Sequence, residues 1–382
     1  RAEMTRPAGD CPWDEPSDLA GIRAARPEAD RAATVLDESL LRDRMTGAWL
    51  GRCIGCMIGK PVEGMSRERI ETILRTGDAY PLTGYFPVIE DLPEGITYKG
   101  ASDPCLTPNI VRGERDDDTD YTVLGLHLVE TFGPAITPEQ IIGEWLVRLP
   151  YQRTYTAERA AMRNWICEVP HPRAAVYMNP YREWIGAQIR ADGWAYCATG
   201  DPELAAEYCW RDASVTHIKN GIYGEMFFGA LIAACFATDD LHEALAVALA
   251  EIPERCRLAA ALRECIGWCA DDDTWEQTWD RIIEKYGHYH AVHTINNALL
   301  CVMGLLHSGG DMRRAICVAV MAGLDTDCNG ATVGSVMGAL LGESGVPEDL
   351  SAPLNDTLET ALSGMAVMRI SDLVARTLAT RA

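Results

Sequence analysis

The stretch DTDCNGATVGSVMGALLG, at residues 325–342, decides how this chain folds, because glycine recurs at every fourth position along it. Its glycines are Gly330, Gly334, Gly338 and Gly342. A second ladder with the same spacing consists of Gly47, Gly51, Gly55 and Gly59. Such spacing leaves one helix face without side chains, so that another helix can approach closely. Each central glycine costs up to about 1 kcal/mol of helix propensity, which tight packing must offset. We expect this packing to bring two helix ends to one point; a crowded helical core is the alternative interpretation.

The remaining pattern predicts an all-α fold, a single compact multi-helix domain with closely packed glycine-ladder helices and long loops. Apolar residues recur at spacings of three and four, which is typical of amphipathic helices. The clearest segments are residues 122–132, 241–249, 298–306 and 354–378. Runs that alternate apolar and polar side chains are almost absent, so a sheet is not expected.

Two segments stand apart from this helical pattern. Residues 1–36 are rich in Pro, Asp, Arg and Ala and predict an N-terminal arm, followed by one helical domain at residues 37–382. Residues 76–115 contain several prolines and glycines and little periodicity. Because irregular segments of this length are usually functional in compact proteins, we expect a lid over a cleft.

The composition limits the classes of partner. Lys and Arg total 34 against 56 Asp and Glu, a formal net charge of −22. So acidic a chain is not expected to bind a nucleic-acid backbone or an anionic membrane surface. No apolar run reaches the roughly 18–20 residues of a membrane span. The 14 cysteines are scattered through apolar segments, which indicates reduced thiols in a cytoplasmic protein.

Two short acidic clusters carry the chemistry. Asp116, Asp117 and Asp118 precede one apolar helical segment, and Asp325 and Asp327 precede the second glycine ladder. Carboxylates packed this densely repel one another and are tolerated near an interior only when they are paired or bound to cations. Ligands of oxygen alone suit Mg²⁺, and also Mn²⁺ or Ca²⁺. The two clusters together predict a hard-cation site.

The chain supplies its own control for the first cluster. Residues 271–274 repeat the same four residue types, Asp-Asp-Asp-Thr. There, Thr274 and Gln277 predict a capping box at the start of a helical segment. We interpret this copy as structural, so the copy at residues 116–119 gains its meaning only from its pairing with the second cluster.

Three segments resemble a known family: GRCIGCMIGKPVEG (51–64), DDDTDYT (116–122) and AVMAGLDTDCNGATVGSVMGALLG (319–342). In this order they resemble the ADP-ribosyl-glycohydrolases, an all-helical dimagnesium family that includes the dinitrogenase-reductase-activating glycohydrolases. The resemblance implies a metal-dependent hydrolase with two Mg²⁺ ions, or Mn²⁺. It would cleave an N- or O-glycosidic bond to ribose in an ADP-ribosylated protein or an ADP-ribose derivative.

The resemblance also implies roles for single residues. The implied metal positions are Asp116, Asp117, Asp118, Asp325, Asp327 and Cys328. Glu63, on a flexible loop, and Asp118 are implied in catalysis. Arg190 and His217 fall near positions that contact the ribose or the phosphates. Without the resemblance, a lone histidine beside a helix is more often a hydrogen-bonded structural residue.

Three positions depart from the family pattern. Asp116 and Cys328 stand where Ser or Thr is usual, and Cys56 replaces the common Asp after Gly55. A thiol is a poor ligand for Mg²⁺, so we expect one ion to be held less tightly, or through Asn329 or water. Two alternatives stay open: a nucleoside or N-ribosyl hydrolase that acts on a small metabolite, and a non-catalytic scaffold that keeps the fold.

Overall fold

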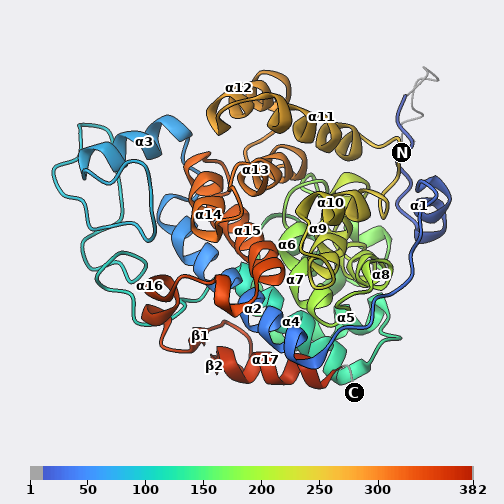
Figure 1. Cartoon of the computed structure of the whole chain (residues 1–382). Coiled ribbons are helices and arrows are strands. Elements are labelled where there is room, and N and C mark those ends of the chain that lie inside the picture. Colours follow the sequence, from blue (N-terminus) through green and yellow to red (C-terminus); the bar gives the residue numbers. More distant parts are fainter. Residues whose placement is uncertain (1–11, 381–382) are drawn as a thin grey trace.

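The computed structural model describes residues 12–380, and regular structure in this range is almost entirely helical (Figure 1). The α-helices are Leu19–Ala25 (α1), Glu38–Gly59 (α2), Arg67–Thr76 (α3), Asp117–Phe132 (α4), Pro138–Arg148 (α5), Thr156–Ile166 (α6), Ala191–Tyr196 (α7), Pro202–Ala213 (α8), Asn220–Cys235 (α9), Leu241–Leu249 (α10), Arg257–Asp271 (α11), Trp275–Tyr286 (α12), Thr294–Leu306 (α13), Met312–Met321 (α14), Thr326–Leu341 (α15), Glu348–Ser351 (α16) and Ile370–Ala379 (α17). Short 3₁₀ turns are Lys60–Val62 (η1), Tyr151–Arg153 (η2), Arg173–Ala175 (η3), Gln188–Arg190 (η4), Glu343–Gly345 (η5) and Ala352–Leu354 (η6). An antiparallel hairpin is formed by Thr357–Glu359 (β1) and Val367–Arg369 (β2). The all-α prediction is confirmed.

The two glycine ladders pack against each other in the middle of the molecule, on α2 and α15 (Figure 1). Gly47 faces Gly338 and Gly55 faces Gly330, so the two helices run antiparallel. A Cβ atom added to Gly55 would overlap the carbonyl group of Gly330, and one added to Gly338 would overlap that of Gly47. The predicted close approach of two helices is therefore confirmed, and it depends on the missing side chains.

This antiparallel packing fixes where the end of α2 lies. The hydroxyl of Thr326, the first residue of α15, donates to the carbonyl of Gly59, the last residue of α2 (2.8 Å). Past η1, the backbone N–H of Gly64 donates to the carbonyl of Leu324 (2.9 Å). Glu63 is thereby held beside the acidic segment that opens α15.

Helix α9 forms the centre of the second half of the molecule. All of its residues are buried, and α7, α8 and α10 lie around it (Figure 1). A helix that is apolar on all sides belongs in a core, because no face of it favours water. Within residues 12–380, no helix is long and apolar enough to cross a membrane.

The predicted helical segments are confirmed except at the C-terminal end. Apolar spacing predicts a helical stripe over residues 354–378, but α17 begins only at Ile370, after the hairpin. Asn355 and Asp356 have φ values of 48° and 52°, a left-handed conformation that ends a helix. The Asp356 carboxylate then accepts the backbone N–H of Ser371 (2.7 Å) near the start of α17. Local turn chemistry overrides the apolar spacing here.

Residues 12–36 of the predicted arm lie along α8 and α11 and include the short helix α1 (Figure 1). Glu15 forms an ion pair with Arg257 (2.7 Å), and the Trp210 indole donates to the carbonyl of Ser17 (2.9 Å). Residues 1–11 of the arm lie outside the described residues. The domain boundary at residue 37 stays a prediction.

The segment between α3 and α4 contains no helix or strand, as its prolines predict, and it extends away from the helices at one side of the molecule (Figure 1). It is anchored where the hydroxyl of Tyr85 donates to the carbonyl of Leu350 (2.6 Å). Its closure over a cleft stays a prediction.

Candidate functional site

Two helices begin at the same place in the molecule, each with an aspartate in the capping position. At α4, the Asp116 carboxylate accepts the backbone N–H of Asp118 (3.2 Å). At α15, Asp325 occupies the capping position, but its side chain makes no capping hydrogen bond. The positive ends of both helix dipoles favour negative charge at this point. The Asp325 carboxylate is thus not explained as a helix cap.

Two overlapping groups of side chains converge there. The first group is Asp118, Asp327 and Cys328, and the second is Glu63, Asp325 and Asp327. In each group, one ligand atom from every residue lies within 4.8 Å of the others. The Cys328 thiol donates to Asp118 Oδ2 (3.2 Å), which joins the starts of α15 and α4 directly. The two acidic clusters of the sequence therefore meet in the fold.

Negative charge exceeds positive charge inside this cluster. Burial and the neighbouring carboxylates raise the pKa of Asp327 well above its usual range, and burial does the same to the pKa of Asp118. Arg52 donates to Asp118 Oδ1 (3.0 Å) but also pairs with Asp192 (3.3 Å). Among the described residues, Asp327 Oδ1 is buried without a hydrogen-bond partner. A buried oxygen of this kind is expected to bind a cation or a proton.

Cys328 is unsuited to be an Mg²⁺ ligand. Burial, together with the charges of Asp118 and Asp325, raises the pKa of its thiol well above the usual range. The thiol keeps its proton and uses it in the hydrogen bond to Asp118. The geometry thus gives Cys328 a positioning contact, and its predicted role as a metal ligand stays a prediction.

Asp116 and Asp117 lie beside the cluster but in neither group of three. Asp116 Oδ2 forms an ion pair with Lys60 Nζ (2.8 Å), at the end of α2. Asp117 is half-buried, and burial with the charges of Asp116 and Asp118 raises its pKa well above the usual range. Metal ligation by these two aspartates stays a prediction.

Glu63 is the member of the cluster that solvent reaches, since its side chain is exposed at the end of η1. The surrounding protein and the charges of Asp325 and Asp116 raise the pKa of Glu63 to about 7. A carboxyl group with this pKa holds a proton on a substantial fraction of molecules near neutral pH. Such a group can act as a general acid or a general base.

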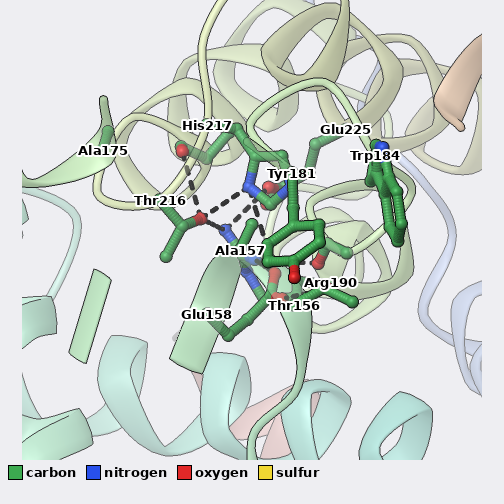
Figure 2. Close-up of polar contacts among 12 residues, drawn as sticks. Thr156, Ala157, Glu158, Ala175, Tyr181, Trp184, Arg190, Thr216, His217 and Glu225 are labelled. Carbon is green, nitrogen blue, oxygen red and sulfur yellow. Dashed lines mark hydrogen bonds and ion pairs between the residues drawn. The ribbon is translucent and has the colours of Figure 1, made fainter. Parts of the chain in front are cut away.

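Arg190 lies in a separate buried network, not in the carboxylate cluster (Figure 2). Its guanidinium pairs with Glu158 (2.7 Å), with Asp212, and more loosely with Glu225 (3.5 Å). The guanidinium also lies over the ring of Trp145, with 5.0 Å to the ring centroid. All of these contacts are within the protein, so contact with a ribose or phosphate stays a prediction.

His217 belongs to the same network. Its Nδ1 lies 2.7 Å from the Thr216 hydroxyl, and that hydroxyl also accepts from Arg190 (3.0 Å; Figure 2). Burial and the nearby Arg190 charge lower the pKa of His217 well below its usual range, so the ring is neutral. A neutral, fully buried imidazole fits a structural residue, and its predicted contact with substrate stays a prediction.

Replacing Arg190 by leucine is expected to destabilise the protein by roughly 3 kcal/mol, because three buried carboxylates lose their common cation. Chemical denaturation measures this change. Arg75→Leu is the matched control, since its ion pair with Glu71 is exposed and should contribute less than about 1 kcal/mol. Unchanged stability with weakened ligand binding would favour the predicted substrate contact instead.

The internal control at residues 271–274 behaves as predicted. Thr274 and Gln277 form a reciprocal capping box at the start of α12, and Asp271 and Asp273 are exposed. The same four residue types thus make a solvated cap in one place and enter a buried cluster in the other. The two copies differ in their neighbours, because the carboxylates at the start of α15 lie beside the start of α4 and not beside the start of α12.

Sequence reasoning missed three residues that position the cluster. Arg52 and Lys60 hold Asp118 and Asp116, and the Asn297 amide oxygen accepts the backbone N–H of Asp325 (3.2 Å). The sequence did indicate a role for Arg52. It lies between Gly51 and Gly55 of a ladder that packs in the interior, and a buried charged residue is expected to have a partner of opposite charge. Asn297 carried no comparable signal.

Comparison with known proteins identifies the family. A model of the family described as ADP-ribosylglycohydrolase matches residues 37–381. The chain belongs to the ADP-ribosylglycohydrolase family. Among solved structures, an "ADP-ribosylglycohydrolase-related protein complex" is similar, with a TM-score of 0.57 and 20% sequence identity over 90% of this chain and 98% of that chain. At this identity the likeness to that structure shows the fold alone. No match was found among the curated proteins.

Proposed function

We propose that this member of the ADP-ribosylglycohydrolase family is a metal-dependent glycosidase that cleaves the N- or O-glycosidic bond to ribose in an ADP-ribosylated protein or an ADP-ribose derivative. The observation that carries the proposal is the convergence of Asp118, Asp325 and Asp327 from two helix starts, with Glu63 at the solvent side. Membership of a hydrolytic family supports the reaction class.

The residues present fit a hard divalent cation. Asp327 Oδ1 is buried with no hydrogen-bond partner among the described residues, and the other converging atoms of the second group are carboxylate oxygens. Oxygen ligands of this kind suit Mg²⁺ or Mn²⁺. We infer that Asp118, Asp325 and Asp327 hold the metal, with Asp116 and Asp117 beside them. A bound divalent ion would supply Lewis acidity and orient the ribose hydroxyls.

The protein side chains carry the proton transfer in this proposal. Cleavage of a glycosidic bond builds positive charge on the sugar, and the leaving atom needs a proton. Glu63 is exposed at the solvent side of the cluster, beside Asp325 and Asp327, and we assign it the transfer of that proton. Asp118 is held in place by Arg52 and Cys328, so its orientation does not depend on the substrate.

Glu63→Gln is expected to lower turnover by roughly 10²–10⁴-fold, the usual contribution of a general acid or base. Binding of Mg²⁺, measured as the rise in melting temperature, should persist because Asp118, Asp325 and Asp327 remain. Steady-state kinetics with the metal present gives the turnover. Turnover equal to that of the wild type would remove Glu63 from the chemistry.

A substrate panel tests the reaction itself. The purified chain with Mg²⁺ or Mn²⁺ is incubated with ADP-ribosylated peptides linked through nitrogen or oxygen, with ADP-ribose derivatives and with simple nucleosides. We expect ADP-ribose to be released from a member of the first two substrate classes. Chromatography measures this release. Release of base or ribose from nucleosides alone would point to a small-metabolite hydrolase, and no release from any substrate would contradict the proposal.

A further inference from the structure

The outer face of α6 and the loop that follows it present an unusual combination of exposed side chains. Of the thirteen large hydrophobic side chains that are exposed within residues 12–380, six lie between residues 151 and 178. Residues 151–182 also contain five arginines, no lysine and only two acidic residues, in a chain whose net charge is −22. One of those two, Glu158, is buried against Arg190 (2.7 Å), so this surface is both apolar and basic.

Helical spacing brings the first part of this surface together. Arg159, Arg163 and Ile166 are four and three residues apart along α6, and such residues share one face of a helix. The Arg159 guanidinium lies over the ring of Tyr155, with 5.3 Å to the ring centroid. It also donates to the backbone carbonyl of Gln152 in η2 (3.3 Å). The surface therefore continues from α6 onto η2.

The loop after α6 extends the same surface at the other end of the helix. Arg163 donates to the carbonyl of Met178 (3.2 Å), and the Arg173 guanidinium lies over the ring of Tyr177, with 5.6 Å to the ring centroid. Met178 is 68% exposed and has a φ of 48°. A long apolar side chain is unfavourable both in water and in the left-handed region, so its presence here indicates a contact outside the chain. We call the surface formed by these side chains the α6 face; its members are Tyr155, Arg159, Arg163, Ile166, Tyr177 and Met178.

The arginines of the α6 face have no counter-ion of their own. Within residues 12–380, neither Arg159 nor Arg163 forms an ion pair, and their guanidinium groups donate to backbone carbonyls and to the amide oxygen of Asn164 (2.9 Å). Arg153 and Arg173, at the two ends of the face, are exposed and also lack an ion pair in this range. Uncompensated positive charge favours an acidic partner, because opposite charges steer and orient docking.

The residue types of the α6 face also fit a protein partner. Tyrosine, methionine and arginine are enriched in the buried centres of protein interfaces, whereas lysine, glutamate and aspartate are depleted there. A nucleic-acid backbone would use the arginines but not the exposed Ile166 and Met178, and the net charge of the chain would repel it. An acidic polypeptide with apolar side chains matches both properties of the face.

The α6 face reaches the neighbourhood of the candidate site through η2. Gln152 and Arg153 line a cavity of about 610 Å³, and Lys60 on the wall of the same cavity pairs with Asp116 beside the carboxylate cluster (2.8 Å). The Arg115 guanidinium on this wall donates to the backbone carbonyl of Arg153 (3.2 Å). A partner on the α6 face would therefore lie next to this cavity.

We propose that the α6 face is a docking surface for an acidic segment of a partner protein. Carboxylates of that segment pair with Arg159 and Arg163. Its apolar side chains cover Ile166, Tyr177 and Met178. The inference goes beyond the proposed function, because docking requires no hydrolysis.

Fluorescence anisotropy with the full chain tests the docking surface. The probe is a short labelled peptide of glutamate, leucine and tyrosine, and the same peptide with lysine in place of glutamate is its control. We expect the wild type to bind only the acidic peptide. Arg159→Glu/Arg163→Glu should bind it at least about tenfold more weakly, since two attractive charges become repulsive.

Arg263→Glu/Arg314→Glu is the matched control variant. Both arginines are exposed, lie on α11 and α14, and form no ion pair within residues 12–380. The control variant changes the net charge by the same amount, so it should bind the acidic peptide like the wild type if the position of the charge decides binding.

Met178→Asp tests the apolar part of the face without disturbing the fold. Aspartate tolerates the left-handed conformation of residue 178, so this variant should be at least as stable as the wild type in denaturant. It should bind the acidic peptide about tenfold more weakly, because an apolar contact is replaced by a repelling charge. The comparison holds even if melting curves show that charge reversal on α6 unfolds the chain.

The other outcomes would overturn the proposal. These are equal binding of the acidic peptide by the wild type and the folded α6-face variants, and equal binding of the acidic and the lysine peptide. Tighter binding of a single-stranded oligonucleotide, lost in the same variants, would assign the face to nucleic acid. A wild-type dimer in sedimentation that the variants abolish would assign it to a second copy of the chain. Acidic-peptide binding without glycosidase activity would support the docking surface while the proposed function fails.

Discussion

Replacing Asp327 by asparagine is expected to abolish metal-dependent stabilisation and to lower kcat/KM by roughly a thousandfold or more, since several kcal/mol of transition-state stabilisation would be lost. Asp327 is the residue common to both groups of converging ligand atoms. Its substitution by asparagine therefore removes one negatively charged ligand from each group at once. Melting curves with and without Mg²⁺, and steady-state kinetics, measure the two effects.

Without metal, the same substitution is not expected to lower the melting temperature. Asp327 is buried among Glu63, Asp325 and Asp118, and these like charges together with burial raise its pKa. An amide of the same shape removes that repulsion, so Asp327→Asn should melt at the same temperature as the wild type or higher in the presence of a chelator. In the wild type, Mg²⁺ at a hundred times its Kd should add about 2.7 kcal/mol of stability.

Asp273→Asn is the control for this experiment. Asp273 is an exposed member of the structural Asp-Asp-Asp-Thr copy, so its substitution should change neither the metal response nor the activity. An Asp327→Asn variant that keeps the full Mg²⁺ response would show that the cluster does not hold the metal.

Replacing Gly334 by leucine is expected to prevent folding, with a loss of more than about 5 kcal/mol. A Cβ atom at this position would overlap the backbone carbonyl group of Gly51 on α2. Neither the Cβ atom nor this carbonyl group can move away by a side-chain rotation. The helices could accept the side chain only by separating, which would open the packing along both ladders. Circular dichroism and denaturant titration measure the loss.

Gly143→Leu is the matched control because Gly143 lies in the middle of α5 with nothing within 4 Å of an added Cβ. There the substitution should stabilise the protein by up to about 1 kcal/mol through helix propensity alone. The same change in residue type is thus expected to act with opposite sign at the two sites. A folded, stable Gly334→Leu variant would contradict the account of the ladder.

The sequence predicted the fold best where a spacing pattern has one structural explanation. Glycines every fourth residue predicted the α2–α15 pair, and that packing places Glu63, just after α2, beside Asp325 and Asp327. The helix at residues 241–249 was also predicted in full. In these cases the spacing alone fixes which groups face each other.

Other features depend on contacts that spacing does not encode. The left-handed Asn355 and Asp356 produce a hairpin inside an apolar stripe that suits a helix equally well. The ion pair of Asp116 with Lys60 joins the start of α4 to the end of α2, and no spacing in the sequence links these two segments. The resemblance placed Arg190 near a ligand, whereas three buried acidic side chains from α6, α8 and α9 surround it.

The central claim is that the aspartates at the starts of α4 and α15 jointly hold divalent cations beside the sugar. Equilibrium dialysis of the wild-type chain against Mn²⁺, with the bound metal measured by elemental analysis, tests it most directly. We expect saturable binding of two ions per chain in the wild type and no saturable binding in Asp327→Asn. No saturable Mn²⁺ bound to the folded wild-type chain would contradict the account.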